Sequence, residues 1–122
     1  MNSRDESVEP LLPLTPPVFQ VLLSLADGEK HGYAILKEVA DQTRGEVRLS
    51  AGTLYGIIKR LLDEGLILES RRRPAREHDD ARRRYYLLTD WGRQVAVAEA
   101  ERMEKLIAMA RGKRLLRKLK LT

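Results

Sequence analysis

Arginines are concentrated in two short runs that flank a polar loop. Guanidinium groups gathered in this way favour phosphates, and the release of counterions makes such binding strongly salt-dependent. One arginine of such a set can also enter the minor groove of DNA. Acidic residues of the same loop partly neutralise the runs, so a solvated, salt-bridged loop is the alternative interpretation. We favour phosphate binding by the two runs, which comprise Arg71, Arg72, Arg73 and Arg76 on one side and Arg82, Arg83 and Arg84 on the other.

A second group of polar residues shares a predicted helix with a narrow apolar face. Such a helix fits the major groove of DNA, where hydroxyls and cations near its start reach base edges and phosphates. Gly52 and Gly56 each lower the stability of the helix by about 1 kcal/mol relative to alanine, and the close approach of a polymer such as DNA is a reason to keep them. The alternatives are a polar face that meets only water and a Tyr55 ring packed on a neighbouring helix. The candidates for DNA contact are Ser50, Gly52, Thr53, Tyr55, Gly56, Lys59 and Arg60.

A third candidate site is His31-Gly32-Tyr33, at the start of another predicted helix. Free backbone N–H groups at a helix start attract anions, so these residues could clamp a phosphate. The alternative is a plain helix start, with Tyr33 packed in the core and His31 as the capping residue. We favour the core position for Tyr33 and leave the role of His31 open.

Composition excludes several classes of function. The chain has 122 residues, a net charge of +5 and no cysteine, so disulfides, thiol chemistry and cysteine-bound zinc are absent. Glu77, His78, Asp79 and Asp80 match no standard ligand set, and the other histidine, His31, is distant, so we expect no metal. No catalytic constellation can be assembled, so we expect neither an enzyme nor a cofactor. Without a signal peptide or a long apolar run, we expect a cytoplasmic protein that does not bind membranes.

The elements that position these residues follow from periodicity and capping. Residues 1–13 resemble a flexible arm, interrupted by prolines. Helices are predicted from Thr15-Pro16-Pro17 to residue 27, over residues 31–43 and over residues 50–65. Two strands of a hairpin follow, over residues 66–73 and 82–88, with Leu66 and Leu68 in alternation on the first and Tyr86 and Leu88 on the second. A long helix then runs from Thr89 towards residue 117. The order predicts a mostly α fold with a small β-hairpin, a winged helix-turn-helix over residues 14–89.

Four short motifs, in order and at matching spacing, resemble the PadR-like winged-helix transcriptional regulators. They are HGYAIL at residues 31–36, GTLY at 52–55, KRLLDEGLI at 59–67 and RYYLLTDWGR at 84–93. The resemblance covers about residues 14–109. It implies a homodimer that binds double-stranded DNA through the third helix and the wing, and often repression that a small-molecule effector relieves. It also implies the short form of the family, with a single C-terminal dimerisation helix.

The last helix, within residues 90–122, carries an apolar stripe and ends in a basic tail. A helix that projects past a small domain must bury such a stripe, and a second copy is the simplest partner, although packing on its own first helix is also open. No aromatic residue follows Trp91, which departs from family members that line a drug pocket with aromatics. A protein-interaction module that does not read DNA is the rival function. The predicted dimer contacts are Trp91, Val95, Ala98, Met103, Leu106, Ile107 and Ala110.

Overall fold

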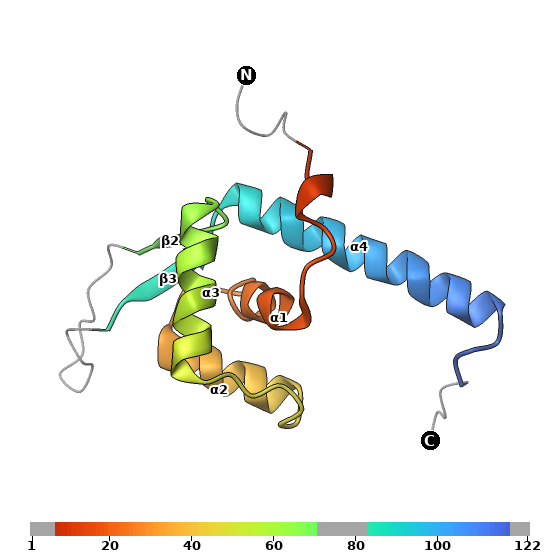
Figure 1. The fold of residues 1–122 in the computed structure, drawn as a ribbon, viewed down its shortest axis with the longest axis horizontal. Helices are drawn as coiled ribbons and strands as arrows, with labels where there is room; N and C mark the ends of the chain where they lie inside the picture. The colour runs from red at the N-terminus through yellow and green to blue at the C-terminus, as the bar shows by residue number, and fades with distance from the viewer. Residues whose placement is uncertain (1–6, 71–82, 118–122) are drawn as a thin grey trace.

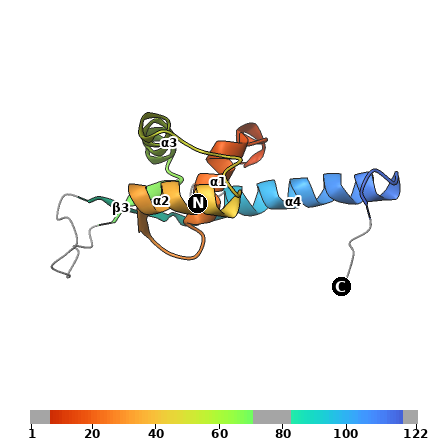
Figure 2. The same ribbon diagram turned by 90° about the horizontal axis from the view of Figure 1, so that it is seen from below.

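The computed structural model describes residues 7–70 and 83–117 of the chain (Figure 1). Helices dominate, and a small antiparallel sheet lies beside them, which confirms the predicted mostly α fold with a β-hairpin. In Figure 2, α3 stands on one side of the row formed by α2 and α4. The elements are η2 (Glu9–Leu11), α1 (Pro16–Ser24), β1 (Lys30–His31), α2 (Gly32–Gln42), α3 (Ala51–Asp63), β2 (Ile67–Glu69), β3 (Tyr85–Leu88) and α4 (Asp90–Gly112).

Side-chain caps start α1, α2, α3 and α4. The side chains of Thr15, His31, Ser50 and Thr89 each accept a hydrogen bond from the backbone N–H three residues later. Each cap satisfies one of the N–H groups that a first turn leaves without a partner, which typically contributes about 1 kcal/mol. The starts predicted for α1 and α3 are confirmed.

The sheet has three strands in the order β1-β3-β2, all antiparallel. β2 pairs with β3, as the hairpin prediction required, whereas β1 was not predicted. β1 is only two residues long, and it becomes a strand because Lys30 and His31 pair with Tyr86 and Tyr85. This pairing carries the start of α2 to the base of the hairpin.

The predicted alternation in the first hairpin strand is wrong at Leu68, whose side chain is exposed. Leu66 is buried, but it lies before the strand, where its backbone N–H bonds to the Leu61 carbonyl at the end of α3. Ile67 then takes the buried position at the start of β2, which sends Leu68 to the outer face.

The core gathers apolar side chains from every helix. α1 contributes most, because Val18, Phe19, Val21 and Leu22 are all buried. The buried residues of the other helices include Ile35 and Val39 of α2, Leu54, Ile58 and Leu61 of α3, and Val95 of α4. Full burial of one such side chain contributes roughly 1.5–3 kcal/mol. α3 therefore has one face held in the core and the opposite face left to solvent.

The end of α3 and the start of α4 meet in a close joint. The Thr89 hydroxyl donates to the Gly65 carbonyl at 2.7 Å, and the Thr89 N–H donates to the Leu66 carbonyl at 3.1 Å. Gly92 lies directly against the Leu66 backbone, and a Cβ at that position would overlap the Leu66 carbonyl oxygen. The angle between α3 and α4 is therefore set by backbone contact.

Residues 7–13, predicted as part of a flexible arm, instead pack on α4, and residues 1–6 lie outside the described part of the chain. Val8, Leu11 and Leu12 are partly buried against the core. The following residue in the core, Leu14, donates its N–H to the buried carboxylate of Glu99 at 3.3 Å. Three apolar residues within five positions were enough to give this short segment a hydrophobic attachment.

The last helix ends at Gly112 rather than near residue 117. The backbone turns at Arg114, which has a φ of 63°, and the Leu115 N–H bonds back to the Ala110 carbonyl at 2.8 Å. α4 extends beyond the rest of the domain, with its C-terminal half clear of the other helices (Figure 1).

Candidate nucleic-acid interface

The outer face of α3 is polar and open to solvent. Ser50, Thr53 and the cations Lys59 and Arg60 are exposed. The Ser50 hydroxyl accepts from the Thr53 N–H and donates to the Thr53 hydroxyl, both at 3.0 Å, so the two side chains are held in one arrangement. Within residues 7–70 and 83–117, Lys59 and Arg60 pair only with exposed carboxylates one turn later, at 3.3 and 3.4 Å. Such exposed pairs contribute little, so both cations remain available to an anion.

Two glycines make the first turns of this face flat. A Cβ built on Gly52 or Gly56 meets nothing within 4 Å, so no contact within the described chain explains the absence of a side chain there. Both glycines lie on the exposed surface of α3. The flat surface allows another backbone to approach α3 closely.

A pocket of about 350 Å³ lies where the start of α2, the middle of α3 and the base of β3 meet. It is called here the tyrosine-arginine pocket. It contains the predicted residues at the start of α2 and one end of the arginine-rich hairpin. Its lining residues are His31, Gly32, Tyr33, Tyr55, Arg83, Arg84 and Tyr86.

The two exposed tyrosines of this pocket differ from their expected positions. Tyr33 was predicted in the core, but its side chain is 65% exposed, because Gly32, Ile35 and Val39 take the buried face of α2. Tyr55 is 48% exposed, and its ring covers Gly32 so closely that a Cβ there would overlap the hydroxyl. Tyr55 therefore packs on α2 and still presents a surface to solvent, which combines the two interpretations of this residue.

His31 links the start of α2 to the hairpin. Its Nδ1 accepts from the Ala34 N–H at 3.1 Å, and its Nε2 lies 3.3 Å from Nη1 of Arg83. The imidazole also stacks on Tyr33, with ring centroids 6.4 Å apart, and meets the edge of Tyr85 at 5.3 Å. The capping role considered for His31 is thus present, and the same side chain positions Arg83 beside two tyrosines.

Of the predicted arginine runs, Arg83 and Arg84 are described and exposed. Arg84 donates to both carboxylate oxygens of Glu69 on the neighbouring strand, each at 3.2 Å, so part of its charge is compensated. Arg83 faces His31 instead, with its Nη1 3.3 Å from the Nε2 of His31. Arg71, Arg72, Arg73, Arg76 and Arg82 lie outside the described residues, as do residues 77–80.

Tyr85 and Tyr86, which the sequence placed in a hairpin strand but not among the DNA contacts, belong to this region. Burial and the nearby Glu69 carboxylate raise the pKa of the Tyr86 hydroxyl above 10.0, so that it stays protonated and able to donate. The signal was the RYYLL run itself, but its closeness to His31 depends on the unpredicted pairing of β1 with β3.

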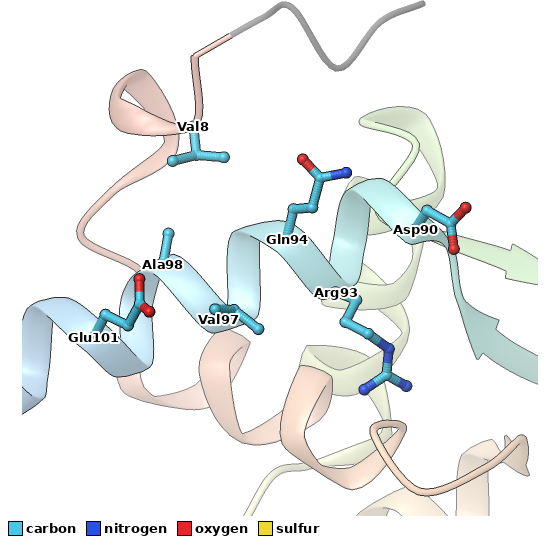
Figure 3. Close-up of a pocket in the computed structure, with 7 residues that line it drawn as sticks. All are labelled: Val8, Asp90, Arg93, Gln94, Val97, Ala98 and Glu101. Carbon is cyan, nitrogen blue, oxygen red and sulfur yellow. The ribbon is translucent and has the colours of Figure 1, made fainter.

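A second, larger groove of about 700 Å³ runs along the outer side of α4 (Figure 3). Val8 forms one wall opposite Ala98, and the floor mixes apolar and charged side chains from α4. Arg93 is fixed by a hydrogen bond of 2.8 Å to the Ala26 carbonyl. The groove is lined by Val8, Asp90, Arg93, Gln94, Val97, Ala98 and Glu101, and none of these side chains is aromatic.

The residues predicted for a dimer contact fall into two groups. Val95 is fully buried and Trp91 is partly buried against the chain's own core, so the assignment of Val95 to a partner surface is wrong: no part of its side chain is left to contact one. Ala98 and Ala110 are partly exposed. Met103, Leu106 and Ile107 are exposed on the projecting half of α4.

Within residues 7–70 and 83–117, no helix has both the length and the apolar character needed to cross a membrane. The same part of the chain holds no group of three or more histidine or acidic side chains arranged for a metal ion.

Comparison with known proteins identifies the family of this chain. The model of the family described as "Transcriptional regulator PadR-like family" matches residues 21–98. A 37.1 kDa protein in transposon TN4556 of Streptomyces fradiae is 41% identical over 86 residues, which cover 70% of this chain and 22% of that protein. The chain thus spans about a fifth of the length of this curated relative.

Solved structures share the fold. A PadR family transcription regulator from Clostridium difficile R20291 is similar with a TM-score of 0.65 and 23% identity, over 80% of this chain and 97% of that one. Bacillus subtilis PadR in complex with operator DNA is similar with a TM-score of 0.55 and 22% identity, over 86% of this chain and 49% of that one.

Proposed function

This chain belongs to the transcriptional regulator PadR-like family, which is a family of regulators and not of enzymes, and we propose that it regulates transcription by binding double-stranded DNA. The main support for DNA binding is the exposed polar face of α3, with its two glycines, beside the tyrosine-arginine pocket. The complex of Bacillus subtilis PadR with operator DNA, which shares the fold, supports the same partner for this chain.

α3 enters the major groove in this proposal. Ser50 and Thr53 lie at its start, where a recognition helix comes nearest to base edges, and their hydroxyls can donate or accept. Gly52 and Gly56 let the helix sit close to the DNA, while Lys59 and Arg60 reach phosphates further along. Few long side chains face the groove, so we expect base readout to rest on a small number of contacts.

The tyrosine-arginine pocket holds a phosphate of the DNA backbone. Arg83 supplies the charge, and the hydroxyls of the two exposed tyrosines, Tyr33 and Tyr55, supply further donors. His31 and Gly32 position these groups, since His31 contacts Arg83 and Gly32 leaves room for Tyr55. The sequence alone suggests that the wing arginines outside the described residues join this contact.

We further propose a homodimer that represses transcription from a pseudo-palindromic operator. The exposed stripe with Met103, Leu106 and Ile107 would pair with a second copy, and Ala98, Ala110 and the edge of Trp91 would border it. Two copies of α3 would then enter successive major grooves about 34 Å apart. Deleting residues 103–122 should leave a monomer by sedimentation, and a persistent dimer would place the interface elsewhere.

A small-molecule effector, if the protein uses one, has a candidate site in the groove along α4 (Figure 3). Arg93, Asp90 and Glu101 line it, so a charged or hydrogen-bonding ligand fits its chemistry better than a flat aromatic one. A ligand there would touch both the N-terminal segment and α4, and it would change DNA affinity if it bound one arrangement of the two better than another.

The decisive experiment has two steps. Binding of the protein to a random duplex is measured over a salt series by fluorescence anisotropy, and the DNA that co-purifies with the protein is sequenced. We expect affinity that falls steeply with salt, together with an enriched inverted repeat. No measurable affinity at low salt would refute DNA binding and favour a winged-helix module that binds proteins.

A further inference from the structure

Arg48 lies in the link between α2 and α3, and its guanidinium rests against the backbone of the same link. A Cβ built on Gly45 would lie 3.1 Å from Nη2, 3.4 Å from Nε and 3.6 Å from Cζ of Arg48, so the guanidinium covers the place where a side chain at position 45 would project. Gly45 also has a φ of 81°, a conformation that favours glycine. This glycine therefore permits the turn and leaves room for the arginine.

Hydrogen bonds within the link fix the backbone on which Arg48 rests. The Thr43 hydroxyl donates to the Val39 carbonyl at 2.8 Å and accepts from the Val47 N–H at 3.0 Å. The Gly45 N–H donates at 2.8 Å to a carbonyl in the last turn of α2. Arg48 is thus attached to a backbone with little freedom, and a ligand that binds its guanidinium has less ordering to pay for.

The link directs Arg48 to the same side as the cap of α3. Val47 and Leu49 are partly buried against the core, whereas Arg48 and Ser50 are exposed. This alternation is that of an extended chain, in which side chains two residues apart point to the same side, about 7 Å from each other. In Figure 2 the link leaves the end of α2 and reaches α3 on the side of the α2–α4 row where α3 stands. Arg48 therefore lies next to the hydroxyls of Ser50 and Thr53.

The charge of Arg48 is not compensated by the described part of the chain. Within residues 7–70 and 83–117, Arg48 takes part in no ion pair. Glu46 is exposed two residues earlier in the link, and it does not pair with Arg48 either. The planar guanidinium, with its several N–H donors, is therefore available to an anion outside the chain.

We propose that Arg48 binds a backbone phosphate of the DNA, at the edge of the major groove opposite to the edge held by the tyrosine-arginine pocket. This inference rests on the proposed DNA binding and adds a contact that none of the predicted sites includes. Arg48 precedes the cap of α3 and so lies outside the helix that enters the groove, where it meets the DNA backbone and not the base edges.

The length of α2 supports contacts at both edges. The tyrosine-arginine pocket lies at the start of α2, and Gly45 lies just beyond its end. The 11 residues of α2 span roughly 16 Å, which is enough to reach across a major groove about 12 Å wide. Arg83 at one edge and Arg48 at the other thus hold α3 between two phosphates and fix its register on the duplex.

The salt dependence of binding tests this contact. Loss of one phosphate contact lowers the slope of log affinity against log salt by about one, so Arg48→Ala should weaken binding to operator and random duplexes alike, by about eightfold more at 0.1 M than at 1 M salt. Arg48→Lys keeps a charge that binds phosphate and should keep most of the slope. Arg48→Ala combined with Arg83→Ala should lower the slope by about two, because the two sites lie apart and act independently.

Lys105→Ala is the matched control, because it removes the same charge from an exposed position on the projecting half of α4, away from α3 (Figure 1). It should leave the slope unchanged, and an equal fall in slope for this variant would reveal a general effect of net charge and overturn the inference. If Arg48→Ala keeps the wild-type slope, Arg48 touches no phosphate, while DNA binding stands. If Arg48→Ala weakens binding to the operator alone, Arg48 reads a base, and the assignment to phosphate is wrong. If the wild type binds no duplex at low salt, the proposed function fails, and this contact fails with it.

Discussion

Replacing Gly56 by alanine separates the stability of α3 from its use as a binding surface. Gly56 lies in the helix with its surroundings empty, since an added Cβ meets nothing within 4 Å. Alanine is better than glycine in a helix interior by about 0.5–1 kcal/mol, because glycine loses more conformational freedom on folding. The substitution should therefore stabilise the free protein and raise its Tm by about 4 °C.

The same methyl group should harm DNA binding. If a DNA backbone or base edge lies against Gly56, the added carbon needs space that the complex does not have. Overpacking of this kind costs about 1–3 kcal/mol, so we expect binding to weaken about tenfold or more. The expected result is thus a protein that is more stable and binds more weakly.

Two measurements on one preparation test this expectation: thermal unfolding followed by circular dichroism, and anisotropy titration with the selected operator. Gly112→Ala is the control, because Gly112 also has empty surroundings but lies at the end of α4, away from α3. It should leave the affinity unchanged. If Gly56→Ala raises the Tm and binds as tightly as the wild type, no DNA lies against this face, and the reasoning about the bare glycines is refuted.

Three further expectations concern other parts of the protein. Arg83→Ala should weaken binding to specific and random duplexes alike and reduce the slope of log affinity against log salt by about one; an unchanged slope in the titrations would contradict a phosphate contact. Thr53→Ala should lose sequence discrimination more than affinity, and an unaltered preference in a random-site selection would count against base readout. The hydrogen bonds from Arg102 lower the pKa of the Glu99 carboxyl below its ordinary value of 4.5. The ionised carboxylate therefore stabilises the fold above pH 4.5, and this contribution is lost as the pH falls through the pKa of the folded state. Glu99→Gln should therefore lower the free energy of unfolding at pH 7 by roughly 1–3 kcal/mol, measured by urea unfolding, and the loss should be smaller at pH 3. An equal loss at both pH values would show that the charge of Glu99 does not contribute to stability.

Local sequence signals were sufficient to predict the helices. Thr15-Pro16-Pro17 and Ser50 are capping sequences, and the spacing of Leu54, Ile58 and Leu61 identifies the buried face of α3 without reference to the rest of the chain. The outer face of α3 followed from the same periodicity, so its polar residues could be named in advance. Their contact with DNA remains a prediction.

Features that depend on distant partners were not predictable in the same way. β1 has two residues and no alternation of its own, and it exists because β3 offers it hydrogen bonds from more than fifty residues away. Tyr33 was misplaced because a helix start with several apolar residues allows two adjacent buried faces. The choice between them depends on Gly32, which is where Tyr55 of another helix fits. Leu14, which directly follows residues 7–13, is likewise held by Glu99, far along the chain.

The contact between Gly92 and the Leu66 backbone leaves the start of α4 little freedom to change its angle to the domain. The 23-residue helix is about 35 Å long, so a rotation of a few degrees about its near end shifts its far end by 2 Å or more. A dimer joined through α4 would have little freedom to adjust at the start of this helix when the spacing between two half-sites changes. The adjustment would have to occur where the two α4 helices meet. Natural variation in operator spacing should therefore be matched by substitutions in the second half of α4 and not by changes near Gly92.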